Sequence, residues 1–459
     1  MEPHAEPLTE QQPPSRRRRW PLVLAALAVV LALVAGGSIT WIVTGQLDPA
    51  DRAGRDGRPT PAASASGRGP ATDAAIQRHD AITELLVARG RAVLARDRAA
   101  FLALIDPAAD GFRERQATVF DRLAEVPFAE WEYDFAGEGP PLDADRAALL
   151  PEGSFVARVT LRYTFRGSDS PVESQQFLTV VPRRGAWLLA GDRDDPGSAQ
   201  SGGFGQDIWE LGPVNVVRGR SSLVIGEADR PALREYARQA DRAVRDVGAV
   251  WKRRWSRRPV VIVPRTQADM ARIVGTSRKG LEQIAAVTTG YSVSGPTQGD
   301  RVVINPAAWR KLAEVGQRVV MAHEVTHLAT RAVTYTSVPI WLAEGFADYV
   351  AYAAVEIPAR VVAEDVLELV RKGKGPRQLP GDTDFDASRG DIAAAYESSW
   401  LAAQMIADRH GERKLVRLYV VMADAGGNPV DQDTQTVLGI SEDQLVKDWR
   451  AVMKSLARG

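Results

Sequence analysis

The first strong pattern along the chain is an apolar run near the N-terminus. No charged residue occurs between Trp20 and Gly45, and residues 21–44 consist mainly of Leu, Val, Ala and Ile. A helix of that length can cross the roughly 30 Å hydrocarbon core of a bilayer. Four arginines, Arg16–Arg19, precede the run, and basic flanks stay on the cytoplasmic side. The pattern predicts a cytoplasmic tail over 1–20, a transmembrane signal-anchor over 21–44, and a single-pass protein of the cell membrane with extracytoplasmic C-terminal domains.

A cleaved signal peptide is the alternative interpretation of the same run. The run is longer than the usual apolar region of a signal peptide, and no clean Ala-x-Ala site closes it before Gly45. We therefore expect residues 21–44 to stay attached and to contact the lipid bilayer. Residues 45–73 contain almost no large apolar side chain and cannot bury enough surface to order themselves. They are expected to form a flexible linker.

Residues 74–195 show helical spacing first and strand alternation afterwards. Apolar residues recur at helical spacing over Ala81–Phe101 and over 112–123. In Phe155–Arg166, every second residue from Phe155 to Phe165 is apolar, and apart from Val156 the positions between them are Arg or Thr. That alternation is typical of a half-buried antiparallel strand. Residues 176–181 and 186–190 predict a hairpin joined by the turn sequence PRRG.

Helices followed by a curled antiparallel sheet resemble the cone-shaped NTF2-like fold, named after nuclear transport factor 2. Residues 74–195 are therefore interpreted as an NTF2-like α+β domain. The one histidine of this domain, His79, is interpreted as a surface or capping residue rather than a catalytic one. Cones of this kind often hold a pocket, so ligand binding and a docking or spacing role are both open for this domain.

Residues 205–459 begin with short apolar runs and end as helices. The run VVIVP at 260–264 suits a buried strand, and residues 285–291 and 301–305 predict two more. Helical patterns follow at 359–371, 393–409, 413–422 and 441–456. The expected fold class is α+β, with a mixed β-sheet and a mainly helical C-terminal part.

Composition removes several functions from consideration. Lys plus Arg and Asp plus Glu both number 58, so the net charge is zero and nothing in the balance indicates a nucleic-acid partner. The chain contains no cysteine, which excludes disulfides, a lipid-modified cysteine, a thiol nucleophile and a cysteine-ligated zinc. Any metal site must therefore use histidine and carboxylate ligands.

Such ligands occur together in one short stretch. Two of only five histidines lie in His323-Glu324-Val325-Thr326-His327, an HExxH sequence. On a helix, residues four apart share one face, so both imidazoles can reach one metal ion. Glu324 is then placed to act as a general base on a metal-bound water. Glu344, seventeen residues beyond His327, is a natural third ligand, and Asp348 follows one helical turn later.

HEVTH at 323–327 and WLAEGFADY at 341–349 resemble the two zinc helices of gluzincin metalloproteases, and most of all the small peptidase MA-like domain of bacterial envelope proteins. The resemblance extends from about Ser221 to the C-terminus and implies a zincin-like fold over 205–459. It implies one Zn²⁺ per chain, held by His323, His327 and Glu344, with Asp348 orienting a zinc-bound histidine. The Gly-rich exopeptidase motif of the related aminopeptidases is absent, so aminopeptidase specificity is not carried over.

A tetrahedral intermediate also needs a donor for its oxyanion, and Tyr396, in AAYESSW, is the predicted residue. The expected function is a membrane-anchored zinc endopeptidase that cleaves a protein or peptide substrate outside the cytoplasm. The alternative is an envelope scaffold with weak catalysis, or a protein that binds a ligand through its NTF2-like domain.

Overall fold

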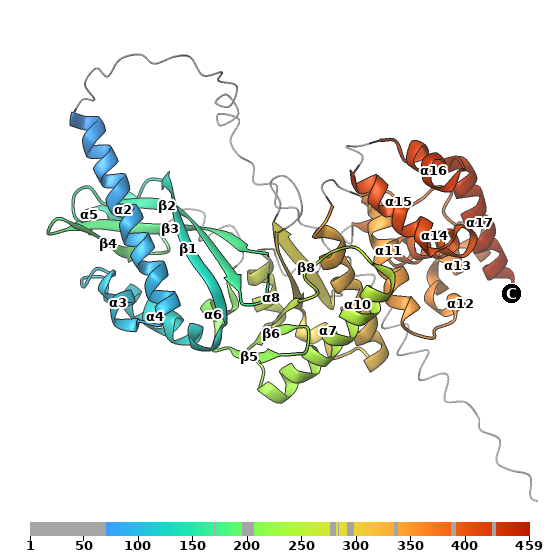
Figure 1. Ribbon diagram of the computed structural model, residues 1–459, viewed down its shortest axis with the longest axis horizontal. Helices are drawn as coiled ribbons and strands as arrows, with labels where there is room; N and C mark the ends of the chain where they lie inside the picture. The colour runs from blue at the N-terminus through green and yellow to red at the C-terminus, as the bar shows by residue number, and fades with distance from the viewer. Residues whose placement is uncertain are drawn as a thin grey trace, which may run out of the picture.

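The computed structural model describes residues 70–168, 170–194, 206–275, 281–282, 284–291, 298–334, 338–386, 392–424 and 428–459. Three parts follow one another along the chain (Figure 1): a sheet with helices, a second sheet with helices, and a group of helices that reaches the C-terminus. The observed fold is α+β with a mixed central sheet and a mainly helical C-terminal part, as the sequence predicts.

The N-terminal part starts with helices that pack on a four-stranded antiparallel sheet. The stretch predicted as one helix over Ala81–Phe101 is broken, because Arg96 adopts a positive φ of 59°. Asp97 then caps the next helix by accepting a hydrogen bond from the amide of Ala100 at 2.9 Å. The helices are α2 (Pro70–Ala95), α3 (Arg98–Ala103), α4 (Asp110–Arg122), η2 (Leu123–Glu125) and α5 (Ala144–Ala148).

The first sheet has the strand order β1-β2-β3-β4. Its strands are β1 (Phe128–Glu138), β2 (Phe155–Phe165), β3 (Val172–Arg183) and β4 (Ala186–Gly191). The predicted alternation of β2 is confirmed, since Ala157, Val159 and Leu161 are buried and Arg158 and Arg162 are exposed. β1 is not among the predicted strands, although three acidic residues alternate with its aromatic ones at the period of a strand. The NTF2-like assignment stays a prediction.

The second sheet has the order β5-β6-β7-β9-β8. The pairs β6–β7 and β7–β9 are parallel, and β5–β6 and β8–β9 are antiparallel, so this sheet is mixed. β8 lies at its edge. The strands are β5 (Asn215–Arg218), β6 (Leu223–Gly226), β7 (Val260–Val263), β8 (Ala286–Tyr291) and β9 (Gln298–Ile304), and the helices between and after them are α6 (Ile208–Leu211), α7 (Arg230–Val250), α8 (Gln267–Val274) and α9 (Pro306–Trp309).

Both faces of the second sheet are buried, each against a different part of the molecule. Because side chains alternate along a strand, Val261 and Val302 point to one face, and Ile262 and Val303 point to the other. The first pair packs with α7 and with α10 (Glu314–Arg331). The second pair belongs to the same apolar cluster as Tyr163 and the rest of the N-terminal core. The N-terminal part and the second sheet therefore share one hydrophobic core.

Polar contacts reinforce this shared core. The Tyr163 hydroxyl of β2 donates to Asp207 Oδ1 at 2.6 Å, and Arg301 of β9 donates to both, at 2.9 and 3.2 Å. Ser170, between β2 and β3, accepts a hydrogen bond from the amide of Gly299 at 2.7 Å. β9 thus pairs with β7 and β8 within its sheet and contacts the N-terminal part through Gly299 and Arg301.

The C-terminal part consists of helices that surround α11 (Ile340–Ala353) (Figure 1). α11 packs against α10 on one side and against α14 on another. The remaining elements are α12 (Ala359–Val362), α13 (Glu364–Arg371), η3 (Asp382–Phe385), α14 (Ala393–His410), α15 (Glu412–Asp424), α16 (Val430–Leu438) and α17 (Glu442–Arg458). Five of them, α12, α13, α14, α15 and α17, lie where the sequence predicts helices, with α12 and α13 sharing the predicted stretch 359–371, and α16 is an addition.

The predicted location in the cell membrane as a single-pass protein needs correction. No helix formed by the described residues is both long and apolar enough to cross a bilayer. The segment 21–44, on which that prediction rested, lies outside the described residues, as do the predicted tail and most of the predicted linker.

Candidate metal centre

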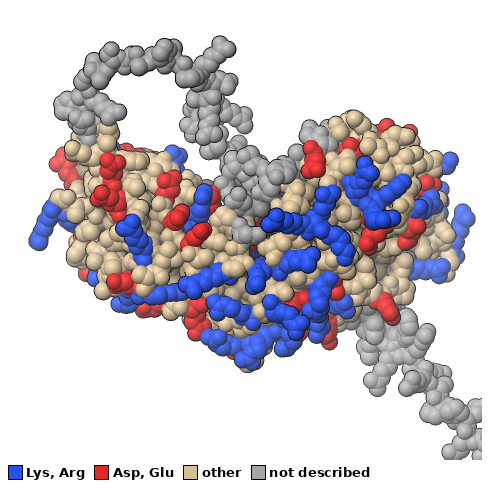
Figure 2. All heavy atoms as spheres, in the orientation of Figure 1, with Lys and Arg blue, Asp and Glu red and all other residues tan. Residues whose placement is uncertain are grey.

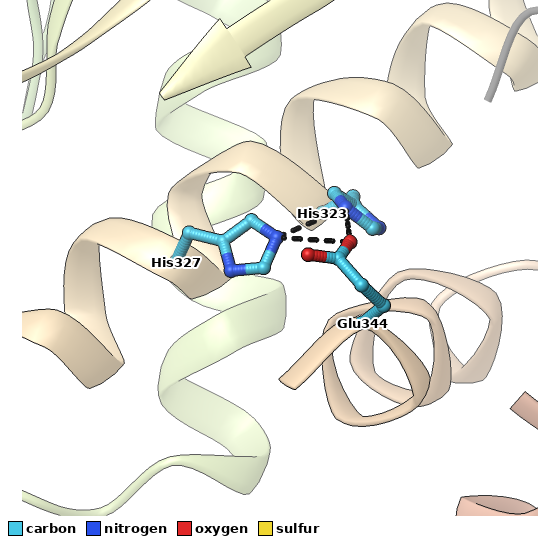
Figure 3. Close-up of side chains that lie close together, drawn as sticks. All are labelled: His323, His327 and Glu344. Carbon is cyan, nitrogen blue, oxygen red and sulfur yellow. Dashed lines mark hydrogen bonds and ion pairs between the residues drawn. The ribbon is translucent and has the colours of Figure 1, made fainter. Parts of the chain in front are cut away.

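The centre is built on two buried helices, α10 and α11. α10 is buried without interruption from Val319 to Thr330, so His323, Glu324 and His327 all lie in a water-poor environment. α11 starts after Pro339, whose extended backbone ends the preceding loop, and Glu344 lies one turn into it. The i, i+4 spacing places both imidazoles on the face of α10 that meets Glu344 (Figure 3).

Three ligand atoms converge at this place. His323 Nε2 and His327 Nε2 lie 3.1 Å apart, and Glu344 Oε2 lies 3.2 Å from the first and 3.4 Å from the second. The ligand atoms of the three residues all lie within 4.8 Å of one another. The exposed fractions of the three residues are only 3, 2 and 1 %. The structure thus brings together the three ligands that the sequence predicts.

The geometry fits a cation better than a network of hydrogen bonds. Both oxygens of Glu344 are buried and neither makes a hydrogen bond of ordinary geometry within the described part of the chain, although Oε2 lies 3.2 and 3.4 Å from the two Nε2 atoms. A buried carboxylate without a donor is strongly unfavourable unless a positive charge compensates it. Two imidazole nitrogens and a carboxylate form the ligand set of zinc sites that keep an open position. The residues present therefore fit a zinc ion.

Asp348 fixes the orientation of one imidazole. Its Oδ1 lies 2.8 Å from His323 Nδ1, so this nitrogen donates and Nε2 faces Glu344. Burial would lower the pKa of His323, but the charge and hydrogen bond of Asp348 and the contact with Glu344 raise it well above its usual range. Burial raises the pKa of Asp348, and the charge and hydrogen bond of His323 oppose that rise.

The carboxylate of Glu344 is held in its charged form. Burial would raise its pKa, but the charge of His327 and the contacts with both imidazoles lower it to about 2. The charged form of this carboxylate is the one that can coordinate a cation.

Glu324 has one partner that sequence reasoning missed, Thr288 of β8. The Thr288 hydroxyl lies 2.7 Å from Glu324 Oε2 and 3.0 Å from the Glu324 carbonyl oxygen. Glu324 and Thr288 are 3 and 1 % exposed. The only available signal was the predicted strand at 285–291. Thr288 and Glu324 are 36 positions apart in the sequence, and no local spacing could predict that they meet.

Tyr396, the predicted oxyanion donor, lies on α14 and is 3 % exposed. Its ring packs edge-on against Phe385 at a centroid distance of 5.0 Å, in a cluster with Ile392 and Ala393. These contacts are those of a core residue, and the oxyanion role stays a prediction. The pKa of Tyr419 on α15 is raised to about 12. Burial is the main cause and the charge of Glu344 adds to it, while a hydrogen bond with Thr330 and the charge of Arg331 act in the opposite direction.

A family model matches the region that contains the centre. Residues 302–455 match the model of the Peptidase MA superfamily. This match contains both α10 and α11 and all three candidate ligands. This match covers about a third of the chain and agrees with the resemblance seen in the sequence. No curated protein matches the chain in a sequence search.

The solved structures that resemble this chain include M1 zinc metallopeptidases. A mutant of a two-domain M1 zinc metallopeptidase bound to L-arginine has a TM-score of 0.32 and 15% identity, covering 65% of this chain and 61% of its own. A mutant from Deinococcus radiodurans bound to a Tyr-Ser-Ala substrate has a TM-score of 0.30 and 14% identity, covering 70% and 60%. This chain thus spans about three fifths of the length of these structures.

Proposed function

We propose that this protein is a zinc-dependent endopeptidase whose metal is held by His323, His327 and Glu344, one ion per chain. The observation that carries the proposal is that two imidazole Nε2 atoms and a carboxylate oxygen, all buried, lie within 4.8 Å of one another. The match of residues 302–455 to the Peptidase MA superfamily supports the same reaction class.

A bound Zn²⁺ would supply a Lewis acid that polarises a carbonyl group and lowers the pKa of a water molecule toward neutrality. Residues of the chain would transfer the protons, orient the ligands and balance the charge. Glu324, next to the first ligand on α10, accepts the proton of the attacking water and later delivers a proton to the leaving amine. Asp348 holds His323 in the tautomer that presents Nε2 to the metal. Glu344 stays ionised and balances part of the positive charge.

The substrate in this proposal is a protein or peptide chain that can reach β8, the strand at the edge of the second sheet. The absence of the Gly-rich exopeptidase motif favours cleavage inside a chain over removal of a terminal residue.

The test combines metal content with hydrolysis. Wild-type protein, Glu324→Gln and His323→Ala are supplied with zinc, freed of excess metal, and assayed for bound zinc and for cleavage of fluorescein-labelled casein. The proposal expects about one zinc and cleavage in wild type, zinc without cleavage in Glu324→Gln, and neither in His323→Ala. Zinc in wild type without any cleavage would instead favour a scaffold that has kept the metal.

A further inference from the structure

Thr288 is the residue through which the second sheet contacts the centre. It lies on β8, and its neighbours on that strand show which way it points. Ala286, two positions earlier, packs on the helical face with α7 and α10, and Val287 packs on the N-terminal face. Side chains alternate along a strand, so Thr288 shares the face of Ala286 and points at α10. Its hydroxyl meets both the side chain and the main chain of Glu324.

The hydroxyl of Thr288 carries one proton and has two acceptors within reach. The Glu324 carboxylate lies 2.7 Å away and the Glu324 carbonyl oxygen lies 3.0 Å away. A charged acceptor forms the stronger hydrogen bond, so the proton goes to the carboxylate. Among the described residues, no other donor reaches this carboxylate, and only 3 % of Glu324 is exposed to solvent. Its orientation therefore depends on one side chain from another element.

Thr288 is itself tied to α10 at a second point. Arg331, the last residue of α10, donates a hydrogen bond to the Thr288 carbonyl oxygen at 3.1 Å. Glu324 and Arg331 lie about two helical turns apart, so strand and helix are joined over that length. The hydroxyl of Thr288 is consequently fixed relative to the helix that carries the two histidines.

We propose that Thr288 is a positioning residue for the peptidase reaction, which holds the Glu324 carboxylate in the orientation needed for proton transfer. The inference rests on the proposed function and adds a residue outside both zinc helices to it. Proton transfer requires the base within hydrogen-bond reach of the proton it accepts, and one rotamer step of a glutamate removes it from reach. The hydroxyl prevents that step without touching the metal ligands.

Three variants test this inference. Thr288→Val removes the hydroxyl and keeps the shape of the side chain, and Thr288→Ser keeps the hydroxyl. Thr289→Val is the matched control, because Thr289 neighbours Thr288 on β8 and its hydroxyl has no hydrogen-bond partner among the described residues. Bound zinc, kcat and KM for fluorescein-labelled casein are measured for each variant and for wild type.

We expect Thr288→Val to retain zinc and KM and to lose about 10- to 100-fold in kcat, the usual effect of removing a hydrogen bond that supports a site residue. Thr288→Ser should restore most of kcat, and Thr289→Val should behave like wild type. An unchanged kcat in Thr288→Val, or equal losses in Thr288→Val and Thr288→Ser, overturns the inference.

A second readout does not depend on activity. In crystal structures of wild type and Thr288→Val, the Glu324 carboxylate should occupy one rotamer in the former and several in the latter. If it keeps one and the same rotamer in both, the inference is wrong even where casein is cleaved. If wild type cleaves nothing, the proposed function fails, and the rotamers still decide whether Thr288 positions Glu324.

Discussion

His323 is the residue that connects the candidate metal ligands to Asp348. Its Nε2 faces Glu344 and His327, and its Nδ1 is bonded to Asp348 at 2.8 Å. A histidine whose second nitrogen is held by a carboxylate keeps one tautomer and one ring orientation. The geometry of the centre thus depends on four side chains from only two helices.

Replacing Asp348 with Asn should weaken zinc binding about 10- to 100-fold, because the amide supports the imidazole less well than a carboxylate does. Competition with a chromophoric chelator measures the zinc Kd of each variant. Asp424→Asn, at an exposed position at the end of α15, is the control and should bind zinc like wild type. Equal affinities for Asp348→Asn and wild type would show that Asp348 does not act through His323.

Asp300 makes stability depend on pH. Burial raises the pKa of Asp300 from 3.8 to about 7, although the charges of Arg331 and Arg301 act in the opposite direction. Neither of its carboxylate oxygens makes a hydrogen bond within the described part of the chain, and Arg331 lies 3.8 Å away. The folded state therefore binds more protons than the unfolded state between about pH 4 and pH 7, and stability falls as pH rises through that window.

The Asp300→Asn substitution should remove this loss. Its unfolding free energy should match that of wild type near pH 4 and exceed it above pH 7, by at most about 4 kcal/mol. Urea unfolding of both proteins at several pH values gives the difference directly, and contributions common to the two proteins cancel. A difference that stays constant with pH would mean that Asp300 ionises normally.

The individual residues differ in how far the sequence could predict them. His323 and His327 follow from local spacing alone, because an i, i+4 pair on a helix shares one face. Glu344 needed the assumption that the next helix folds back on α10, which the family resemblance supplied. Thr288 was out of reach, because its contact with Glu324 depends on the register of an edge strand against a helix, and no spacing encodes that register.

At the scale of elements, the close approach of α11 and α14 determines where Glu344 lies. A Cβ added at Gly345 would lie 2.7 Å from the carbonyl carbon of Ser399 on α14, so the two backbones pack without a side chain between them. Trp449 on α17 donates a hydrogen bond to the Ser398 carbonyl oxygen at 2.9 Å. This bond ties α14 to α17 next to the place where α14 meets α11.

Gly345→Ala should therefore be destabilising despite the higher helix propensity of alanine. The added methyl group must push α11 away from α14, at a cost of roughly 1–3 kcal/mol in unfolding free energy, and should weaken zinc binding through Glu344. Gly248→Ala on α7 is the matched control. Nothing lies within 4 Å of a Cβ there, so it should be neutral or stabilising by up to about 1 kcal/mol. If both variants unfold alike, the close contact does not constrain α11.

The period of the side chains predicted β2 but not β1, and breaks within elements were not predicted. β2 alternates between apolar and polar residues over most of its length, and its span was predicted almost to the residue. The break between α2 and α3 depends on the positive φ of Arg96 and on the Asp97 cap, and the apolar spacing continues across it. The pattern of side chains reports which face is buried, but it does not report a local change in backbone direction.

At the scale of the whole molecule, the N-terminal part covers one face of the second sheet. The sequence could not reveal this, because a strand such as VVIV at 260–263 is apolar on both faces and does not indicate what covers either. Charged groups also cross the boundary, since Arg230 at the start of α7 pairs with Glu125 at 2.6 Å. Although the net charge is zero, Lys and Arg gather along the lower edge of the view, where α7 lies (Figure 2).

A chain of residues 206–459 alone should therefore fail to form a stable monomer, because Ile225, Ile262 and Val303 would become exposed on a flat sheet face. Size-exclusion chromatography and thermal unfolding compare it with residues 70–459, which keep the shared core. A soluble, cooperatively unfolding 206–459 would show that the N-terminal part is dispensable for the folding of the rest of the chain.

The central claim is that His323, His327 and Glu344 hold one zinc ion. Anomalous X-ray diffraction at the zinc edge, from crystals grown with zinc, tests it most directly. The account predicts one strong anomalous peak per chain at about 2.0–2.2 Å from the two Nε2 atoms and a Glu344 oxygen. A peak located elsewhere, or no peak at these residues despite saturating zinc, would contradict it.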